Sequence, residues 1–129
     1  MAFNLNSIDK NAKTQGTWEH FQGSEFLIAS TSNFAFQEGF QKLQRPHQRQ
    51  IDKGTLSPEI SSDILCRAMA DHILLDWRDV EADGKAVPYT KEAAYRALKE
   101  HDELRSFVQE VAMDITYFKV KQEEKEVKN

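Results

Sequence analysis

The sequence predicts a mainly α fold of the α+β class, in which a short N-terminal β-hairpin is followed by a bundle of about four helices. Large apolar and polar side chains alternate in part over residues 17–29, which favours strands. Apolar residues at helical spacing follow in several later segments. A chain of 129 residues is long enough to bury one core, so one domain is expected.

Three parts of the chain differ in character. Residues 1–15 are polar and have no sustained period, which predicts a flexible N-terminal segment. Residues 16–118 carry the periodic apolar segments and predict a single domain. Residues 119–129 contain four basic and three acidic side chains with almost nothing to bury, which predicts a charged, solvated C-terminal tail.

The predicted hairpin consists of two runs, Thr17–Phe21 and Glu25–Ala29, joined at Gln22-Gly23-Ser24. A lone hairpin is marginally stable in water. We therefore expect its strands to lie against the helices.

The first predicted helix begins at Asn33 and stops before Pro46, because Phe36, Phe40 and Leu43 fall at i, i+4 and i+7. The next helix begins at Pro58, since Ser57 is a favoured N-cap and proline is favoured at the first helical position. We expect that helix to run to Trp77 with an apolar face. Its buried side should contain Ile60, Ile64, Leu65, Ala68, Met69, Ile73 and Trp77.

A compact connector separates this long helix from the next. Asp83-Gly84 is a turn dipeptide, and Pro88 cannot donate a backbone hydrogen bond. Thr90 can cap a third helix that runs to about Glu100. Asp102 can cap the fourth, whose apolar stripe is the clearest in the chain. That stripe contains Leu104, Phe107, Val108, Val111, Ala112, Ile115 and Phe118.

Neither a metal site nor an enzyme is predicted. The connector matches positions one, three, five and six of a calcium loop, but position twelve is Thr90 instead of glutamate, so too few oxygens converge. His72 and Asp76 would lie one turn apart on the long helix, yet no nucleophile or phosphate loop accompanies them. Cys66 lies in an apolar run and reads as a small buried residue. No cofactor is expected.

Charge and hydropathy restrict the possible partners. A net charge of -4 and a pI near 5.6 disfavour a nucleic-acid module. Residues 42–53 are a local exception, since Lys42, Arg45, His47, Arg49 and Lys53 concentrate there; a solvated connector and a phosphate-contacting patch both remain open. No apolar run reaches the length of a membrane span, and the N-terminus lacks the pattern of a signal peptide.

The connector carries Trp77, Val80, Asp83-Gly84 and then Tyr89-Thr90 at a helix start. In this it resembles the middle of tail assembly chaperones from long-tailed, siphovirus-type bacteriophages. The resemblance extends over about residues 15–118. It includes Gly16-Thr17-Trp18, Phe26-Leu27-Ile28-Ala29, Asn33-Phe34, Leu43 with Pro46, the Ile64 to Trp77 run, Ala93, Ala94, Leu98 and Phe118.

This resemblance implies a non-catalytic protein of the host bacterial cytoplasm that is absent from the mature virion. Tail assembly chaperones bind the tape-measure protein, keep its apolar helices soluble and help recruit the major tail (tube) protein; self-association is also possible. We expect apolar side chains to make the partner contacts. The candidates are Phe34, Phe36 and Phe40, followed by Phe107, Val111 and Phe118, and each can also be ordinary core.

The sequence is also compatible with two other functions. One is a structural head-to-tail connector subunit that stays in the finished particle. The other is a small nucleic-acid-associated regulator that uses the basic segment 42–53, for which binding would weaken steeply with salt.

Overall fold

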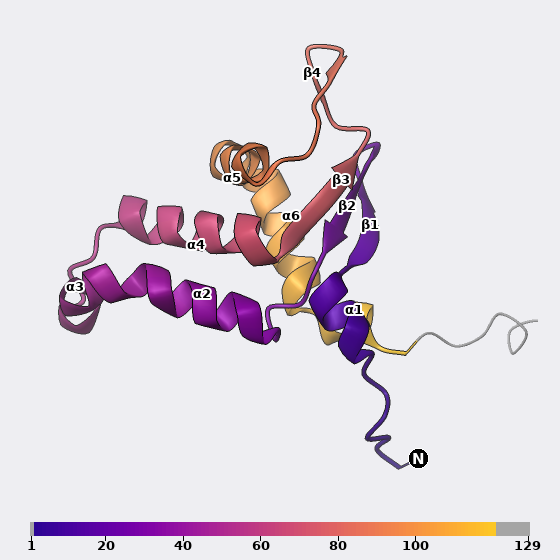
Figure 1. The fold of residues 1–129 in the computed structure, drawn as a ribbon, viewed down its shortest axis with the longest axis horizontal. Helices are drawn as coiled ribbons and strands as arrows, with labels where there is room; N and C mark the ends of the chain where they lie inside the picture. The colour runs from indigo at the N-terminus through magenta and orange to yellow at the C-terminus, as the bar shows by residue number, and fades with distance from the viewer. Residues whose placement is uncertain (1, 121–129) are drawn as a thin grey trace, which may run out of the picture.

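A computed structural model describes residues 2–120 of the chain, and Figure 1 shows its elements. In chain order they are α1 (Lys10–Gln15), β1 (Thr17–Phe21), β2 (Ser24–Ile28), α2 (Phe34–Gln44), the 3₁₀ turn η1 (Arg45–His47), α3 (Gln48–Lys53), α4 (Pro58–His72), β3 (Leu74–Arg78), β4 (Glu81–Ala82), β5 (Lys85–Ala86), α5 (Lys91–Glu100), α6 (Asp102–Met113) and the 3₁₀ turn η2 (Ile115–Phe118).

The predicted fold class, a short hairpin followed by a bundle of about four helices, was wrong, because the structure is a mixed α+β fold with a three-stranded and a two-stranded sheet. The predicted hairpin is only part of the larger sheet. In that sheet β2 pairs with β1 on one side and with β3 on the other, both antiparallel, in the order β1-β2-β3. A second hairpin, β4-β5, follows directly after β3.

The long helix ends five residues earlier than the sequence predicted. It stops at His72, and the apolar residues after it become β3. Phe26 of β2 lies opposite Trp77, and the backbone N–H of Ala29 donates to the carbonyl of Ile73 at 2.8 Å. The periodicity of a short apolar run fits a helix and a strand equally well. Here the run forms a strand because β2 has backbone N–H and C=O groups on the side away from β1 that need hydrogen-bond partners.

Three predicted helix starts are confirmed, two of them predicted from capping residues and the one at Asn33 from apolar spacing. The side chains of Asn33, Ser57 and Thr90 accept hydrogen bonds from the amides three residues later, at 2.8, 3.2 and 2.9 Å. These contacts satisfy amides that have no partner inside the helix. Asp102 does not cap α6 as predicted. It is the first residue of that helix, and its carboxylate contacts Arg105 at 2.8 Å.

The last helix is also shorter than predicted, since α6 ends at Met113 and η2 carries the chain to Phe118. Part of the N-terminal segment is helical, because residues 10–15 form α1. Asp9 caps α1, and its own amide donates to the carbonyl of Phe118 at 2.7 Å. Ile8 and Lys119 form an isolated antiparallel bridge. Of the predicted C-terminal tail, residues 121–129 lie outside the described part of the chain.

The core lies between the sheet and the helices. Helices α2 and α4 lie side by side and run antiparallel, while α5 and α6 pack beside α4 and the sheet (Figure 1). Phe26, Ile28, Met69, Leu98 and Val108 are among the buried side chains. Cys66 is fully buried, as expected. No helix within residues 2–120 has the length and apolar character needed to cross a bilayer.

Candidate functional site

The connector predicted between the long helix and α5 folds into a protruding arm. Its strands β4 and β5 pair through Glu81 with Ala86 and Ala82 with Lys85. Asp83 and Gly84 form the tip with φ of 52° and 80°, the left-handed pair that a two-residue hairpin turn requires. Residues 81–86 are all exposed, and Figure 1 shows the arm standing away from the body. We call residues 79–87 the arm.

The base of the arm is fixed by hydrogen bonds. The indole N–H of Trp77 donates to the carbonyl of Val87 at 2.8 Å. The amide of Val87 donates to the carbonyl of Val80, also at 2.8 Å. The hydroxyl of Ser24 donates to the carbonyl of Asp79 at 2.7 Å. An exposed hairpin of two-residue strands is marginal by itself, so these contacts hold its direction.

Trp77 also anchors the aromatic floor beneath the arm. Its ring meets Phe26 edge to face at 6.4 Å and Tyr89 edge to face at 5.4 Å between centroids. The hydroxyl of Tyr89 donates to the carbonyl of Leu74 at 2.7 Å. Burial, with smaller effects from Asp76 and Asp71, raises the pKa of Tyr89 to about 12. The hydroxyl therefore stays protonated and keeps this hydrogen bond at neutral pH.

A hollow of about 410 Å³ lies between the arm, the sheet and α5. Its walls are mainly apolar and come from β2, β3, the arm, α5 and α6. They include Phe26, Trp77, Val80, Val87, Ala93, Ala97 and Leu104. Small side chains at Ala93 and Ala97 on α5 leave this space open.

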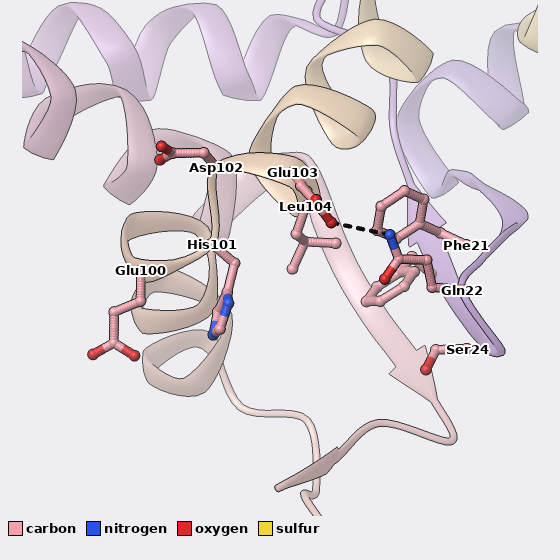
Figure 2. Close-up of a pocket in the computed structure, with 9 residues that line it drawn as sticks. Phe21, Gln22, Ser24, Glu100, His101, Asp102, Glu103 and Leu104 are labelled. Carbon is pink, nitrogen blue, oxygen red and sulfur yellow. Dashed lines mark hydrogen bonds between the residues drawn. The ribbon is translucent and has the colours of Figure 1, made fainter.

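A second hollow of about 380 Å³ adjoins the first at the junction of α5 and α6. The two share Phe26, Glu100, His101 and Leu104 as lining residues, so they form one groove. Figure 2 shows the second hollow, with Phe21 and Leu104 beside a hydrogen bond of 3.0 Å from the Gln22 amide to Glu103. We call the two hollows together the Trp77 groove.

The surroundings of the groove are acidic. The arm and the groove lining carry six carboxylates, at Asp79, Glu81, Asp83, Glu100, Asp102 and Glu103. The basic side chains among the same residues are Lys85, Arg96 and His101. Asp102 is paired with Arg105, which lies outside this set. In Figure 2 the carboxylates of Glu100 and Asp102 point away from Phe21. The first hollow thus has a mainly apolar lining, whereas the second is apolar only at Phe21, Phe26 and Leu104, and carboxylates occur in the lining of both.

A family model described as YdaY prophage protein matches residues 29–129. The chain belongs to the YdaY prophage protein family. The match covers most of the chain, from the residue after β2 to the C-terminus, and includes the arm and α5. It supports a prophage origin for the protein. No curated protein and no solved structure matches the chain.

In this YdaY-family protein the six predicted partner-binding residues do not form one surface. Phe36, Val111 and Phe118 are buried, with exposures of 7%, 1% and 1%. Phe34, the first residue of α2, is 75% exposed. Phe40 is half-buried and stacks on Phe36 at 5.8 Å. Phe107 is half-buried and stacks on Phe21 at 4.5 Å.

These positions separate the candidates into two groups. The three buried residues hold the core together, and they reach a partner only if the core opens. A partner-binding role stays a prediction for all six residues, and in the folded state only Phe34, Phe40 and Phe107 have side chains that are not buried.

The predicted relation of His72 to Asp76 is corrected by the structure. His72 ends α4 while Asp76 lies in β3, where its carboxylate accepts the amide of Trp77 at 2.8 Å. The imidazole of His72 instead lies over Gly39 of α2. It packs two helices together.

The basic segment 42–53 is more ordered than the sequence suggested. It comprises the end of α2, the turn η1 and the helix α3. Lys42, Arg45, Arg49 and Lys53 are exposed, while His47 is half-buried. Figure 1 shows α3 at the opposite end of the molecule from the arm.

Sequence reasoning missed the groove. Its walls come from residues far apart in the chain that meet only in the folded protein. The available signal was the connector around Trp77, which combines large apolar residues with an exposed turn but no helical period.

Proposed function

We propose that this YdaY-family protein is a non-catalytic tail assembly chaperone. In this role it binds the tape-measure protein of its prophage, keeps that protein soluble and helps recruit the tail-tube subunits. The prophage origin and the resemblance of the Trp77 connector to tail assembly chaperones support this proposal.

The observation that carries the proposal is the Trp77 groove. A chaperone for amphipathic helices needs an open apolar surface that is held ready by a rigid frame. In the groove the half-buried side chains of Val80 and Val87 lie over the buried ring of Trp77, and three hydrogen bonds fix the arm beside them. Binding by apolar contact needs no bond to be made or broken.

Two reactive side chains have structural surroundings that agree with a non-catalytic role. Cys66, the single cysteine of the chain, is fully buried inside α4. His72 is half-buried and packs against Gly39 of α2.

Co-expression tests the proposal. The tape-measure protein of the same prophage should move from the pellet to the supernatant when this chain is co-expressed. The two proteins should then co-purify. The control is an unrelated small acidic protein expressed at the same level. A tape-measure protein that stays in the pellet, or is equally soluble with the control, contradicts the proposal.

Mass spectrometry of purified virions separates the chaperone from a head-to-tail connector. A chaperone leaves during assembly, so its peptides should be absent from mature particles. A connector would be found at a fixed copy number relative to the portal or tube proteins.

A further inference from the structure

We infer that the Trp77 groove is the client site, and that it takes an amphipathic helix whose apolar stripe is flanked by lysine or arginine. This inference rests on the proposed function and gives it a place on the molecule. It names the chemistry of the bound segment, which the proposed function leaves open.

The shape of the groove suits neighbouring apolar side chains from one helix. Its two hollows adjoin over Phe26 and Leu104, and each is large enough to receive an apolar side chain. Side chains at i, i+3 and i+4 lie together on one face of a helix. Such a face can fill both hollows, while the opposite face of the helix stays in water.

The frame around the groove is prearranged for binding. Trp77 is only 7% exposed, and its indole nitrogen is already bonded to the arm. Little order has to be gained at the floor when a ligand arrives, which reduces the cost of association. Ala97 contributes only a methyl group to the wall, so the ligand can approach α5 closely.

The charge around the groove selects the flanks of the ligand. The arm and the lining carry six carboxylates, one of them paired with Arg105, together with one lysine and one arginine, Lys85 and Arg96. Glu81 and Glu100 are among the residues that line the mainly apolar hollow. A helix with lysine or arginine beside its stripe places opposite charges at this edge, whereas glutamate there is repelled. Electrostatic complementarity of this kind sets specificity and the rate of association.

Two synthetic helical peptides provide the probes. Both carry the same leucine stripe at i, i+3, i+4 and i+7; one has lysine and the other glutamate on the flanks. We expect the lysine peptide to bind at least about tenfold more tightly, a difference of about 1.4 kcal/mol. Its affinity should fall as salt is added. Equal binding of the two peptides overturns the inference.

Charge reversal locates the site. The double variant Glu81→Lys with Glu100→Lys should weaken the lysine peptide at least about tenfold. The matched control is Glu38→Lys with Glu110→Lys, which makes the same change in net charge at exposed sites outside the groove. The control should bind nearly as the parent protein does. Equal losses in both double variants overturn the inference.

A steric variant tests the groove without changing its charge. Ala97→Phe should fill the hollow beside α5 and abolish peptide binding, while Ala35→Phe, at an exposed position of α2, should leave binding intact. Normal binding by Ala97→Phe overturns the inference. A second outcome also overturns the inference. If the free protein self-associates, the peptide does not displace the second copy and Ala97→Phe abolishes the self-association, then the groove holds a second copy of the chain.

Failure of the inference and failure of the proposed function give different results. If the groove variants still solubilise the tape-measure protein as the parent does, the site is wrong and the chaperone role stands. If the lysine peptide binds in the groove but the parent protein does not solubilise the tape-measure protein, the proposed function is wrong. In that case the groove serves another helical partner.

Discussion

The indole N–H of Trp77 donates to the carbonyl of Val87 at 2.8 Å, and this bond joins the end of the three-stranded sheet to the base of the arm. The chain leaves the sheet after Arg78 and comes back beside Trp77 at Val87. Because Trp77 is also part of the core, the arm is tied directly to the most buried layer of the protein.

Replacement of Trp77 by phenylalanine should remove this bond while keeping an aromatic ring. The carbonyl of Val87 then loses its partner, so the free energy of unfolding should fall by about 1 to 3 kcal/mol. Urea unfolding measures this. Trp18→Phe is the control. Trp18 packs with the guanidinium of Arg78 at 3.7 Å, and its loss should cost less than about 1 kcal/mol. If both variants lose the same free energy of unfolding, the Trp77–Val87 hydrogen bond does not stabilise the protein as proposed.

Gly39 of α2 leaves room for the imidazole of His72, which ends α4. A Cβ built there would lie 2.5 Å from Nε2 of His72, closer than real contacts allow. Ala is favoured over Gly inside a helix by about 1 kcal/mol. The added methyl group must displace the imidazole of His72. Overpacking of this kind costs about 1 to 3 kcal/mol, so Gly39→Ala should nevertheless destabilise the protein.

A double-mutant cycle separates these two effects. In a His72→Ala background the obstruction is gone, and Gly39→Ala should then stabilise the protein by about 0.5 to 1 kcal/mol, its intrinsic helix preference. Thermal unfolding of the four proteins gives the coupling. If Gly39→Ala has the same sign in both backgrounds, the imidazole of His72 is not what opposes the added methyl group.

Local signals made several elements predictable from sequence. The caps at Asn33, Ser57 and Thr90 act on amides three residues away, and the two runs of the first hairpin are joined by a short turn. In each case the deciding contact lies within a few residues. For this reason the starts of α2, α4 and α5 and the strands of the hairpin agree with the structure.

Long-range contacts account for what the sequence did not reveal. Residues 74–78 continue an apolar run after α4, and only their pairing with β2, almost fifty residues earlier, makes them a strand. The groove depends on this same pairing, because it places Trp77 beside Phe26 and under the arm. An apolar stripe in the sequence identifies buried residues such as Val111. It does not show which apolar surface remains open.

Two threonines should respond in opposite directions when their hydroxyl is replaced by a methyl group. The hydroxyl of Thr17 is buried and has no hydrogen-bond partner among the described residues. Thr17→Val removes this unpaired group and should stabilise the protein by about 1 kcal/mol. The hydroxyl of Thr90 caps α5, so Thr90→Val should destabilise it by about 0.5 to 2 kcal/mol. Chemical unfolding measures both variants. If the free energy of unfolding changes in the same direction in both, the roles given to the two hydroxyls are wrong.

Tyr89 should make the protein sensitive to alkaline pH. Its pKa is about 12 in the folded protein, against an ordinary value of 10.0, because burial disfavours the phenolate and Asp76 and Asp71 add to the effect. The folded state therefore holds the proton more tightly than the unfolded state. This contribution to stability is complete below pH 10 and is lost as pH rises from 10 to 12.

Tyr89→Phe tests this expectation. The variant loses the hydrogen bond to Leu74, so at neutral pH it should be less stable than the parent by about 0.5 to 1.5 kcal/mol. The difference should shrink between pH 10 and 12, because only the parent has Tyr89 to titrate. Tyr95, whose pKa is raised mainly by its hydrogen bond to Asp63, is common to both proteins and cancels from the comparison. Urea midpoints measured across this range supply the data, and a constant difference would show that Tyr89 titrates alike in the folded and unfolded states.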